Sequence, residues 1–82
     1  LPLGRAYGII ELAALPEFVG HSLAELKLRN RYHVQVIAIR ELVPERFHVA
    51  PAPDFVIKDS DSLVLIGENE NLERIRTRVE KG

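Results

Sequence analysis

The side chains in this sequence that could carry out chemistry are few, and most of them have a structural explanation. Acyl transfer needs a nucleophile beside a base, but Ser22 stands where it can cap a helix, and Ser60 and Ser62 belong to a turn. Closely spaced carboxylates can exchange protons, yet Asp59 and Asp61 lie around the same turn, where acidic side chains bond their own backbone. We therefore expect no catalytic residue and no enzymatic activity.

Metal and phosphate sites are also not indicated. His21, His33 and His48 are the only nitrogen ligands, and no two of them have the short spacing that marks a zinc site. The chain contains no cysteine. Gly67 ends an apolar run, but the acidic residues after it would repel a phosphate, and no glycine-rich loop is present. The sequence thus predicts neither a metal nor a cofactor.

A group of basic residues is the remaining chemical feature. Lys27, Arg29 and Arg31 alternate around the expected end of the first helix. They are explained equally well as a basic helix C-terminus that complements the helix dipole. Alternatively, together with the apolar neighbours Leu28 and Val36, they form a local site for an anionic ligand that carries phosphates and flat rings.

Length and composition limit the classes of function. With 82 residues, the chain has room for one modest core and no separate catalytic domain. Hydrophobic residues make up 46% and charged residues 28%, which is typical of a folded globular domain. A net charge of -1 gives no reason to expect attraction to nucleic acid or to an anionic membrane surface. The lack of cysteine fits a reducing compartment.

The first part of the chain reads as a strand followed by a short helix. Residues 8–15 are short, apolar and β-rich at their start, which predicts a strand. Ser22 and Glu25 have the spacing of a capping box, a specific signal for a helix start. The apolar side of this helix is formed by Leu23, Leu26 and Leu28.

Residues 34–40 are rich in β-branched side chains and predict a second strand. Strict alternation places Val34, Val36 and Ala38 on one face and Gln35, Ile37 and Ile39 on the other. The succession of strand, helix and strand suggests a parallel pair with a right-handed crossover.

The second half adds two more strands. Residues 46–49 are expected to return as a hairpin partner of the second strand, and they end at residues 51–53, where two prolines make a rigid edge segment. Residues 62–67 are almost wholly apolar and predict a central strand.

A helix closes the chain. Asn69 is a good cap, and Leu72, Ile75 and Val79 recur at helical spacing. The layout is a small α+β domain of the order β-α-β-β-β-α, with two helices packed on a mainly β layer. We expect residues 1–6 to be a linker remnant, residues 7–82 to form the domain, and the chain to be a piece of a longer protein.

Five segments, in this order and spacing, resemble the C-terminal subdomain of the regulator of K+ conductance (RCK_C), also called the TrkA C-terminal domain. They are residues 18–26, 28–32, 36–40, 51–53 and 57–67. The match covers nearly everything from Tyr7 to Ile75. The segment at residues 51–53, Pro-Ala-Pro, makes the chain look most like the Ktr-type gating subunits.

The resemblance implies a role in regulation. In this family the subdomain follows a Rossmann-type nucleotide-binding domain on the cytosolic side of a potassium channel or transporter. Such subdomains dimerise and, in several members, bind cyclic di-AMP across the dimer cleft. The implied partners are a second copy and a membrane potassium channel or transporter subunit, and the implied location is the cytoplasm, peripheral to the inner membrane. From the net charge of -1 we expect no nucleic acid as a partner. The alternative is a ligand-free dimerisation and coupling module of a channel, transporter or cation/proton antiporter.

The resemblance also implies a ligand site. Carried over by position, Arg29 would face a phosphate, and Leu28, Val36 and Pro51 would bound the adenine. The full set of expected ligand-binding residues is Leu23, Ala24, Lys27, Leu28, Arg29, Gln35, Val36 and Pro51.

Three positions depart from the family pattern. Lys27 stands where such binders often have an acidic residue, and Gln35 stands where asparagine is usual. His33 replaces a frequent glycine, so we expect an unusual backbone conformation there.

Overall fold

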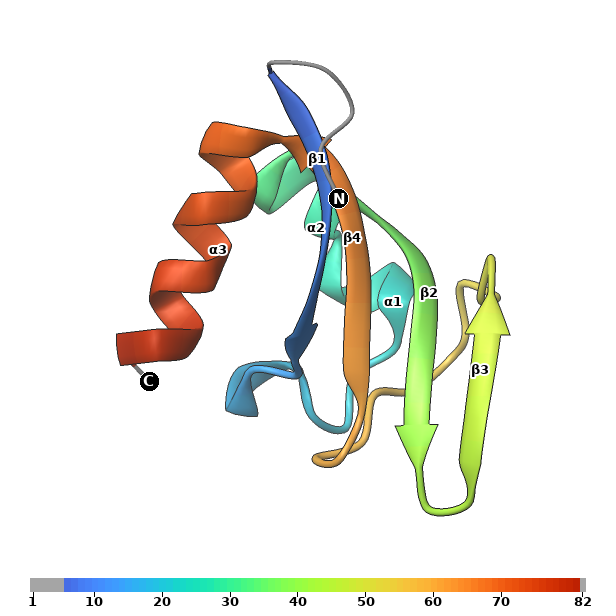
Figure 1. The fold of residues 1–82 in the computed structure, drawn as a ribbon. Helices are drawn as coiled ribbons and strands as arrows, with labels where there is room; N and C mark the ends of the chain where they lie inside the picture. Colours follow the sequence, from blue (N-terminus) through green and yellow to red (C-terminus); the bar gives the residue numbers. More distant parts are fainter. Residues whose placement is uncertain (1–5, 82) are drawn as a thin grey trace.

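The computed structural model describes residues 6–81 and consists of a sheet with helices on one of its faces (Figure 1). In chain order the elements are β1 (Tyr7–Ala13), the 3-10 helix η1 (Pro16–Phe18), α1 (Leu23–Leu26), α2 (Leu28–Tyr32), β2 (Val34–Leu42), β3 (Glu45–Val49), β4 (Ser62–Glu68) and α3 (Asn69–Lys81). The α+β fold class and the strand order along the chain are confirmed. The helix predicted after Ser22 is present as two short helices, α1 and α2.

The predicted domain limits stay predictions. Apart from Ala6, the expected linker at residues 1–6 lies outside the described residues.

The sheet is antiparallel throughout, with its strands in the order β1-β4-β2-β3. β4 lies between β1 and β2, which confirms the prediction of a central strand at residues 62–67. Its position follows from its composition, because Leu63 and Leu65 are fully buried and the alternate residues Val64 and Ile66 are half-buried. β1 and β2 point in the same direction but are separated by β4, so the predicted parallel pair of neighbours is wrong.

A bulge in β2 changes the faces that alternation predicted. The pairing with β4 shifts between Val36 and Ala38, so that Val36 lies opposite Leu65 and Ile39 lies opposite Leu63. Because Leu63 and Leu65 share one face of β4, Val36 and Ile39 both point to the core, and Ile39 is fully buried. The prediction that Ile39 faces away from Val36 is therefore wrong. β3 pairs with β2 in the expected hairpin.

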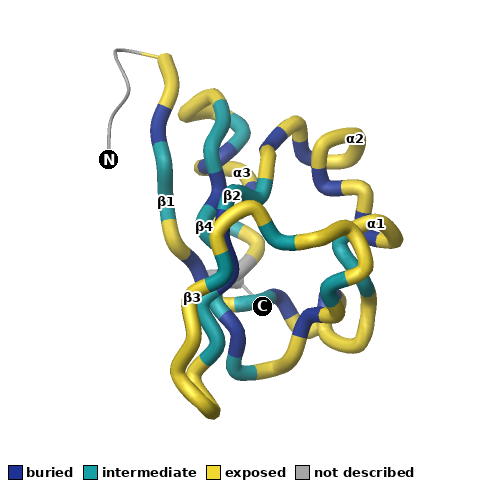
Figure 2. Tube along the Cα trace, turned by 90° about the vertical axis from the view of Figure 1, so that its right-hand side faces the viewer, coloured by how far each residue is buried: buried dark blue, intermediate teal, exposed yellow. Residues whose placement is uncertain are grey.

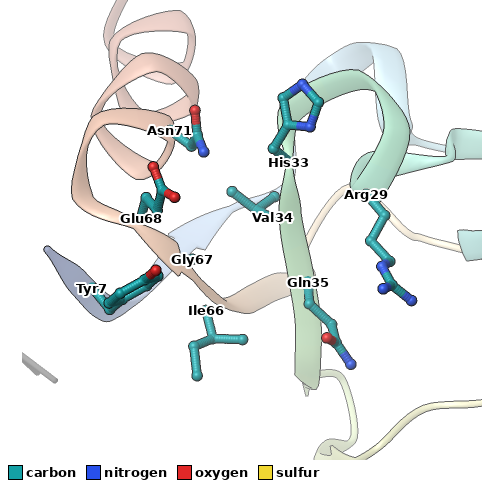
Figure 3. Close-up of a pocket in the computed structure, with 9 residues that line it drawn as sticks. All are labelled: Tyr7, Arg29, His33, Val34, Gln35, Ile66, Gly67, Glu68 and Asn71. Atoms are coloured by element: carbon teal, nitrogen blue, oxygen red, sulfur yellow. The ribbon is translucent and has the colours of Figure 1, made fainter.

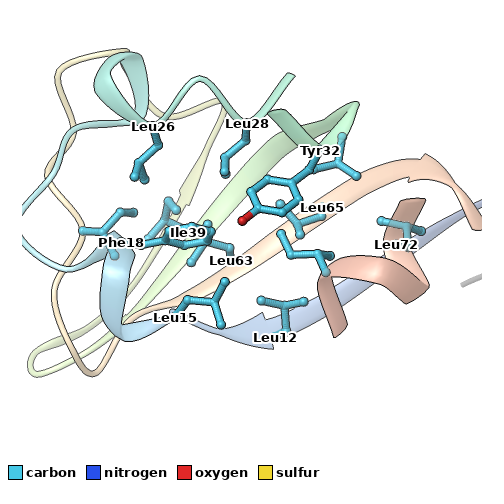
Figure 4. Close-up of a cluster of buried hydrophobic side chains, with 13 residues drawn as sticks. Leu12, Leu15, Phe18, Leu26, Leu28, Tyr32, Ile39, Leu63, Leu65 and Leu72 are labelled. Carbon is cyan, nitrogen blue, oxygen red and sulfur yellow. The ribbon is translucent and has the colours of Figure 1, made fainter. Parts of the chain in front are cut away.

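The hydrophobic core lies between the sheet and the helices (Figure 4). At its centre the ring of Phe18, which is fully buried, meets the ring of Tyr32 edge to face, with the ring centroids 6.4 Å apart. The buried hydrophobic residues of the core are Leu12, Leu15, Phe18, Leu26, Leu28, Tyr32, Val34, Ile39, Ile57, Leu63, Leu65, Leu72 and Ile75. Each large apolar side chain buried here contributes about 1.5–3 kcal/mol of transfer free energy.

The helices cover only one face of the sheet. α3 contacts β1 and β4, and α2 contacts both β2 and α3. Leu72 and Ile75 are buried as their helical spacing predicted, whereas Val79 lies outside the described side chains. Asn69 is the first residue of α3 rather than the residue before it. Figure 2 shows that β3, at the edge of the sheet, is almost entirely exposed.

Candidate functional site

A surface pocket beside β2 brings together all eight residues of the predicted ligand site. Its volume is about 330 Å³, within the size range of small-molecule sites. The eight predicted residues in its lining are Leu23, Ala24, Lys27, Leu28, Arg29, Gln35, Val36 and Pro51. They come from α1, α2, β2 and the segment after β3, so the fold gathers residues that lie far apart in the sequence. Their role as ligand contacts stays a prediction.

Three further residues line the pocket and were not predicted from the sequence. These are Asn30, Val34 and Pro53. For two of them the sequence contained a signal that could have predicted their place in the lining. Val34 precedes Val36 by two positions in a strand and therefore shares its face, and Pro53 belongs to the same rigid segment as Pro51.

The capping box predicted from the sequence fixes the start of α1 at the pocket wall. The backbone N–H of Glu25 donates to Oγ of Ser22 at 3.2 Å, and the backbone N–H of Ser22 donates to Oε1 of Glu25 at 2.9 Å. The hydrogen bond from the backbone N–H of Ser22 to the Glu25 carboxylate lowers the pKa of Glu25, because it stabilises the charged form. Since α1 has only one turn, this reciprocal pair is a large share of what holds it.

Backbone hydrogen bonds join α1 to the proline segment on the opposite side of the pocket. The N–H of Ala24 donates to the carbonyl of Pro53 at 2.9 Å, and the N–H of Leu23 donates to the carbonyl of Phe55 at 3.0 Å. Ser22 also forms an isolated bridge with Val56. The two walls are therefore connected through the main chain, and side-chain substitutions in the pocket should leave its frame in place.

Lys27 separates α1 from α2 and has a left-handed backbone, with φ 48° and ψ 48°. The reason lies in its neighbours Leu26 and Leu28, which are both buried. In a continuous helix, residues two apart point about 200° from each other, so only one of these leucines would reach the core. The turn at Lys27 lets both pack inward and leaves the lysine exposed at the edge of the pocket.

Lys27 and Arg29, which we call the basic rim, give the pocket its charge. Both side chains are exposed, and neither makes an ion pair with any side chain in the described part of the chain. The described lining contains no carboxylate. Leu28, Val36 and Pro51 are half-buried or buried and supply the apolar part of the lining. The pocket thus combines apolar surface with uncompensated positive charge, a combination suited to nucleotide phosphates and bases.

Arg29 also lines a neighbouring pocket of about 410 Å³, which the sequence did not predict (Figure 3). The other lining residues are Tyr7, His33, Val34, Gln35, Ile66, Gly67, Glu68 and Asn71. Figure 3 shows the Arg29 and Gln35 side chains extending on one side of β2, while Glu68 and Asn71 face β2 from the other. This second pocket carries charges of both signs and indicates no single class of ligand.

Other kinds of site are not seen in the part of the chain that the structure describes. Within residues 6–81, no three histidine or acidic side chains gather where they could hold a metal ion. The helices in this range are also too short or too polar to cross a membrane.

His33 has the unusual backbone conformation that we expected at a position where the family often has glycine, with φ 57° and ψ 36°.

Comparison with known proteins identifies relatives in potassium transport. Over 57 residues the chain is 39% identical to the K(+)/H(+) antiporter subunit KhtT of Bacillus subtilis (strain 168), a match that covers 70% of this chain and 34% of KhtT. Over 74 residues it is 28% identical to the Ktr system potassium uptake protein A of the same organism, covering 90% of this chain and 32% of that protein. The chain thus spans about a third of the length of these relatives.

Solved structures of several proteins share the fold, among them those of KtrA and BusR. The RCK C domain of the potassium transport protein KtrA, in complex with cyclic di-AMP, has a TM-score of 0.78 at 29% identity, covering 88% of this chain and 82% of that chain. The RCK_C domain dimer of BusR from S. agalactiae, also in complex with cyclic di-AMP, has a TM-score of 0.70 at 26% identity, covering 89% and 93%. A longer BusR chain in complex with promoter DNA has a TM-score of 0.69 at 26% identity, covering 88% of this chain and 34% of that chain.

The family is identified by a direct match to its sequence model. The TrkA-C domain model matches residues 8–79, nearly the whole described chain. The match agrees with the resemblance of the five sequence segments and with the shared fold of the KtrA domain. TrkA-C domains are regulatory domains of transport proteins and are not enzymes. The chain therefore belongs to the TrkA-C (RCK_C) family.

Proposed function

We propose that this chain is the ligand-sensing and dimerisation domain of a protein that controls potassium transport, and that two copies bind cyclic di-AMP in the cleft between them. The observation that carries the proposal is the pocket beside β2, where the basic rim adjoins apolar surface from Leu28, Val36 and Pro51. In the proposed complex Arg29 binds a phosphate and the apolar residues contact the adenine.

The symmetry of the ligand supports a site between two copies. Cyclic di-AMP has two identical halves, and a two-fold dimer presents the same pocket twice, once to each half. The pocket is open to solvent in a single chain, as expected for half of a site. The complexes of the KtrA domain and of the BusR dimer with this ligand support the same arrangement.

The domain would act by preferring one arrangement of subunits when the ligand is bound. A ligand shifts a conformational equilibrium only by the difference in its affinity for the two states. A ligand held between two copies contacts both, so its affinity depends on how they are placed. Its binding energy can therefore shift the parent protein toward one of its two subunit arrangements. We propose that this parent protein is a cytoplasmic subunit of a membrane potassium channel or transporter.

Isothermal titration of this chain with cyclic di-AMP tests the site. Arg29→Ala should weaken binding about 10- to 100-fold, because a hydrogen bond to a charged group contributes about 1.5–3 kcal/mol. Arg74→Ala is the matched control, since Arg74 is exposed on α3 and does not line the pocket. Micromolar or tighter binding that Arg29→Ala leaves unchanged would refute the site.

A ligand-free dimerisation and coupling module is the second candidate. It is favoured by apolar side chains exposed around the β2–β3 hairpin, where Phe47 is 50% and Val49 is 73% exposed. Sedimentation velocity over a dilution series separates the two roles. A dimer of equal stability with and without cyclic di-AMP, and no heat of binding, would favour the second; a dimer stabilised by the ligand would favour the first.

The absence of nucleic acid as a partner remains a prediction for this chain. BusR binds promoter DNA, but the matching domain is only part of that protein. The net charge of -1 of this chain supports the prediction, because DNA binding requires a basic surface.

A further inference from the structure

The charge of the pocket exceeds what a cyclic dinucleotide needs. The basic rim contributes two positive charges, Lys27 and Arg29, and no described lining residue carries a negative one. This positive charge is concentrated in a chain whose net charge is -1. Some bases elsewhere in the described residues, namely Arg40, Lys58 and Arg78, are paired with acids, whereas the two cations of the basic rim are not. The basic rim is therefore available to a ligand.

Charge balance across a dimer indicates a more negative ligand. If two copies share one ligand, as the proposed function requires, the two rims supply four positive charges. The two phosphodiesters of a cyclic dinucleotide supply only two negative ones. A linear dinucleotide with a terminal phosphate supplies about 2.5–3, one from its single phosphodiester and about 1.5–2 from the monoester, which ionises twice near neutral pH. We propose that the pocket also binds linear adenine dinucleotides bearing a terminal 5′-phosphate, and that Lys27 recognises that phosphate.

The geometry of Lys27 suits this role. Its left-handed backbone lies at the break between α1 and α2, so its side chain is exposed at the pocket edge instead of following the helix surface. An ammonium on a flexible four-carbon arm is a mobile point charge, which suits a terminal phosphate that has no fixed orientation. Arg29, with its planar fork of donors, suits the internal phosphodiester.

The experiment compares the two ligands by isothermal titration at low ionic strength. The linear ligand is 5′-phosphoadenylyl-adenosine, and the cyclic ligand is cyclic di-AMP. Lys27→Gln should weaken binding of the linear ligand about fivefold more than it weakens binding of the cyclic ligand, the effect of one additional exposed ion pair. Raising the salt concentration should remove the difference, because exposed charges are screened. Arg74→Gln, which removes a charge far from the pocket, should change neither affinity.

The outcomes separate this inference from the proposed function. Binding of the cyclic ligand without binding of the linear one would overturn the inference and leave the proposed function standing. If Lys27→Gln weakens the binding of both ligands equally, Lys27 does not recognise the terminal phosphate. Binding of neither ligand would overturn both proposals. Lys27→Asn is a second variant, since asparagine tolerates the left-handed backbone well, and thermal unfolding checks that each variant folds.

Discussion

Two groups of charged side chains in this domain differ in whether they are paired within the chain. The first, which we call the Glu41 network, consists of Glu41, His48, Lys58 and Asp61. Within it Glu41 accepts from both His48 and Lys58, and Asp61 also pairs with Lys58. The second is the basic rim, whose two cations have no described acidic partner. Internal pairing satisfies the first group, while the second is left for a ligand.

The Glu41 network has a structural task. It joins the β2–β3 hairpin to the segment before β4, beside the ring of Phe55. That ring lies 5.2 Å from the His48 ring centroid and 5.2 Å from Nζ of Lys58. The comparison teaches that charge alone does not mark a functional site, because the unpaired group and not the larger one lines the pocket. It predicts that changes in the network alter stability and leave ligand binding unchanged.

The largest loss of stability is expected from Asp61→Ala. Asp61 is 1% exposed, and its Oδ2 accepts from the backbone N–H of Lys58 at 2.8 Å and from Nζ of Lys58 at 3.3 Å. Removing the carboxylate leaves that N–H unpaired inside the turn and breaks the ion pair. We expect a loss of about 2–3 kcal/mol of unfolding free energy in urea titrations. Affinity for cyclic di-AMP should stay within about twofold of the original.

Asp59→Ala is the control for this experiment. Asp59 is an exposed residue of the same turn, and its substitution should change the unfolding free energy by less than about 0.5 kcal/mol. Similar losses for the two variants would show that the network does not carry the stability that we attribute to it. A loss of ligand affinity in Asp61→Ala alone would show that the two groups of charges are coupled.

A smaller loss of stability, which depends on pH, is expected from Glu41→Gln. Hydrogen bonds from Lys58 and then His48 lower the pKa of Glu41 to about 2 from its ordinary value of 4.5. A lowered pKa contributes stability that is fully present above pH 4.5 and is lost as the pH falls toward 2. The difference in unfolding free energy between the original chain and Glu41→Gln should therefore shrink across that interval.

Urea titrations at several pH values between neutrality and pH 2 measure this difference. Glu45→Gln is the matched control, because Glu45 is an exposed carboxylate on the same hairpin outside the Glu41 network. Its difference from the original chain should stay nearly constant with pH. A constant difference for Glu41→Gln as well would mean that the network does not depend on the charge of Glu41.

Local signals in the sequence predicted much of the fold. The capping box at Ser22, the apolar run of β4 and the β2–β3 hairpin are each encoded within a few residues. The order of strands in the sheet is not, because β4 pairs with β1, which lies far away in the sequence, and no local period records such a pairing. The bulge after Val36 was missed for a related reason, since strict alternation has no place for an extra residue.

The pocket was predicted mainly through the resemblance to the family. The residues themselves indicated only the basic group and its neighbours Leu28 and Val36. The break at Lys27 was missed, although the pair Leu26 and Leu28 carried a signal. Two large apolar residues at a spacing of two do not fit one face of a helix. The Glu41 network could not be foreseen, because its members come from three separate segments.

The smallest predicted effect concerns the backbone that holds the basic rim. His33 ends α2 with a left-handed backbone, is exposed, and its side chain has no hydrogen bond or ion pair in the described structure. Glycine adopts this conformation without a steric cost, although it loses more entropy on folding. His33→Gly should therefore raise the unfolding free energy by up to about 1 kcal/mol and leave the affinity for cyclic di-AMP unchanged. Arg31→Gly, two residues earlier and inside α2, should lower the unfolding free energy by a similar amount, because the backbone of Arg31 is helical. If the unfolding free energy rises in His33→Gly and falls in Arg31→Gly, the backbone geometry keeps the basic rim in place. If it falls in both variants, the His33 side chain is needed for that.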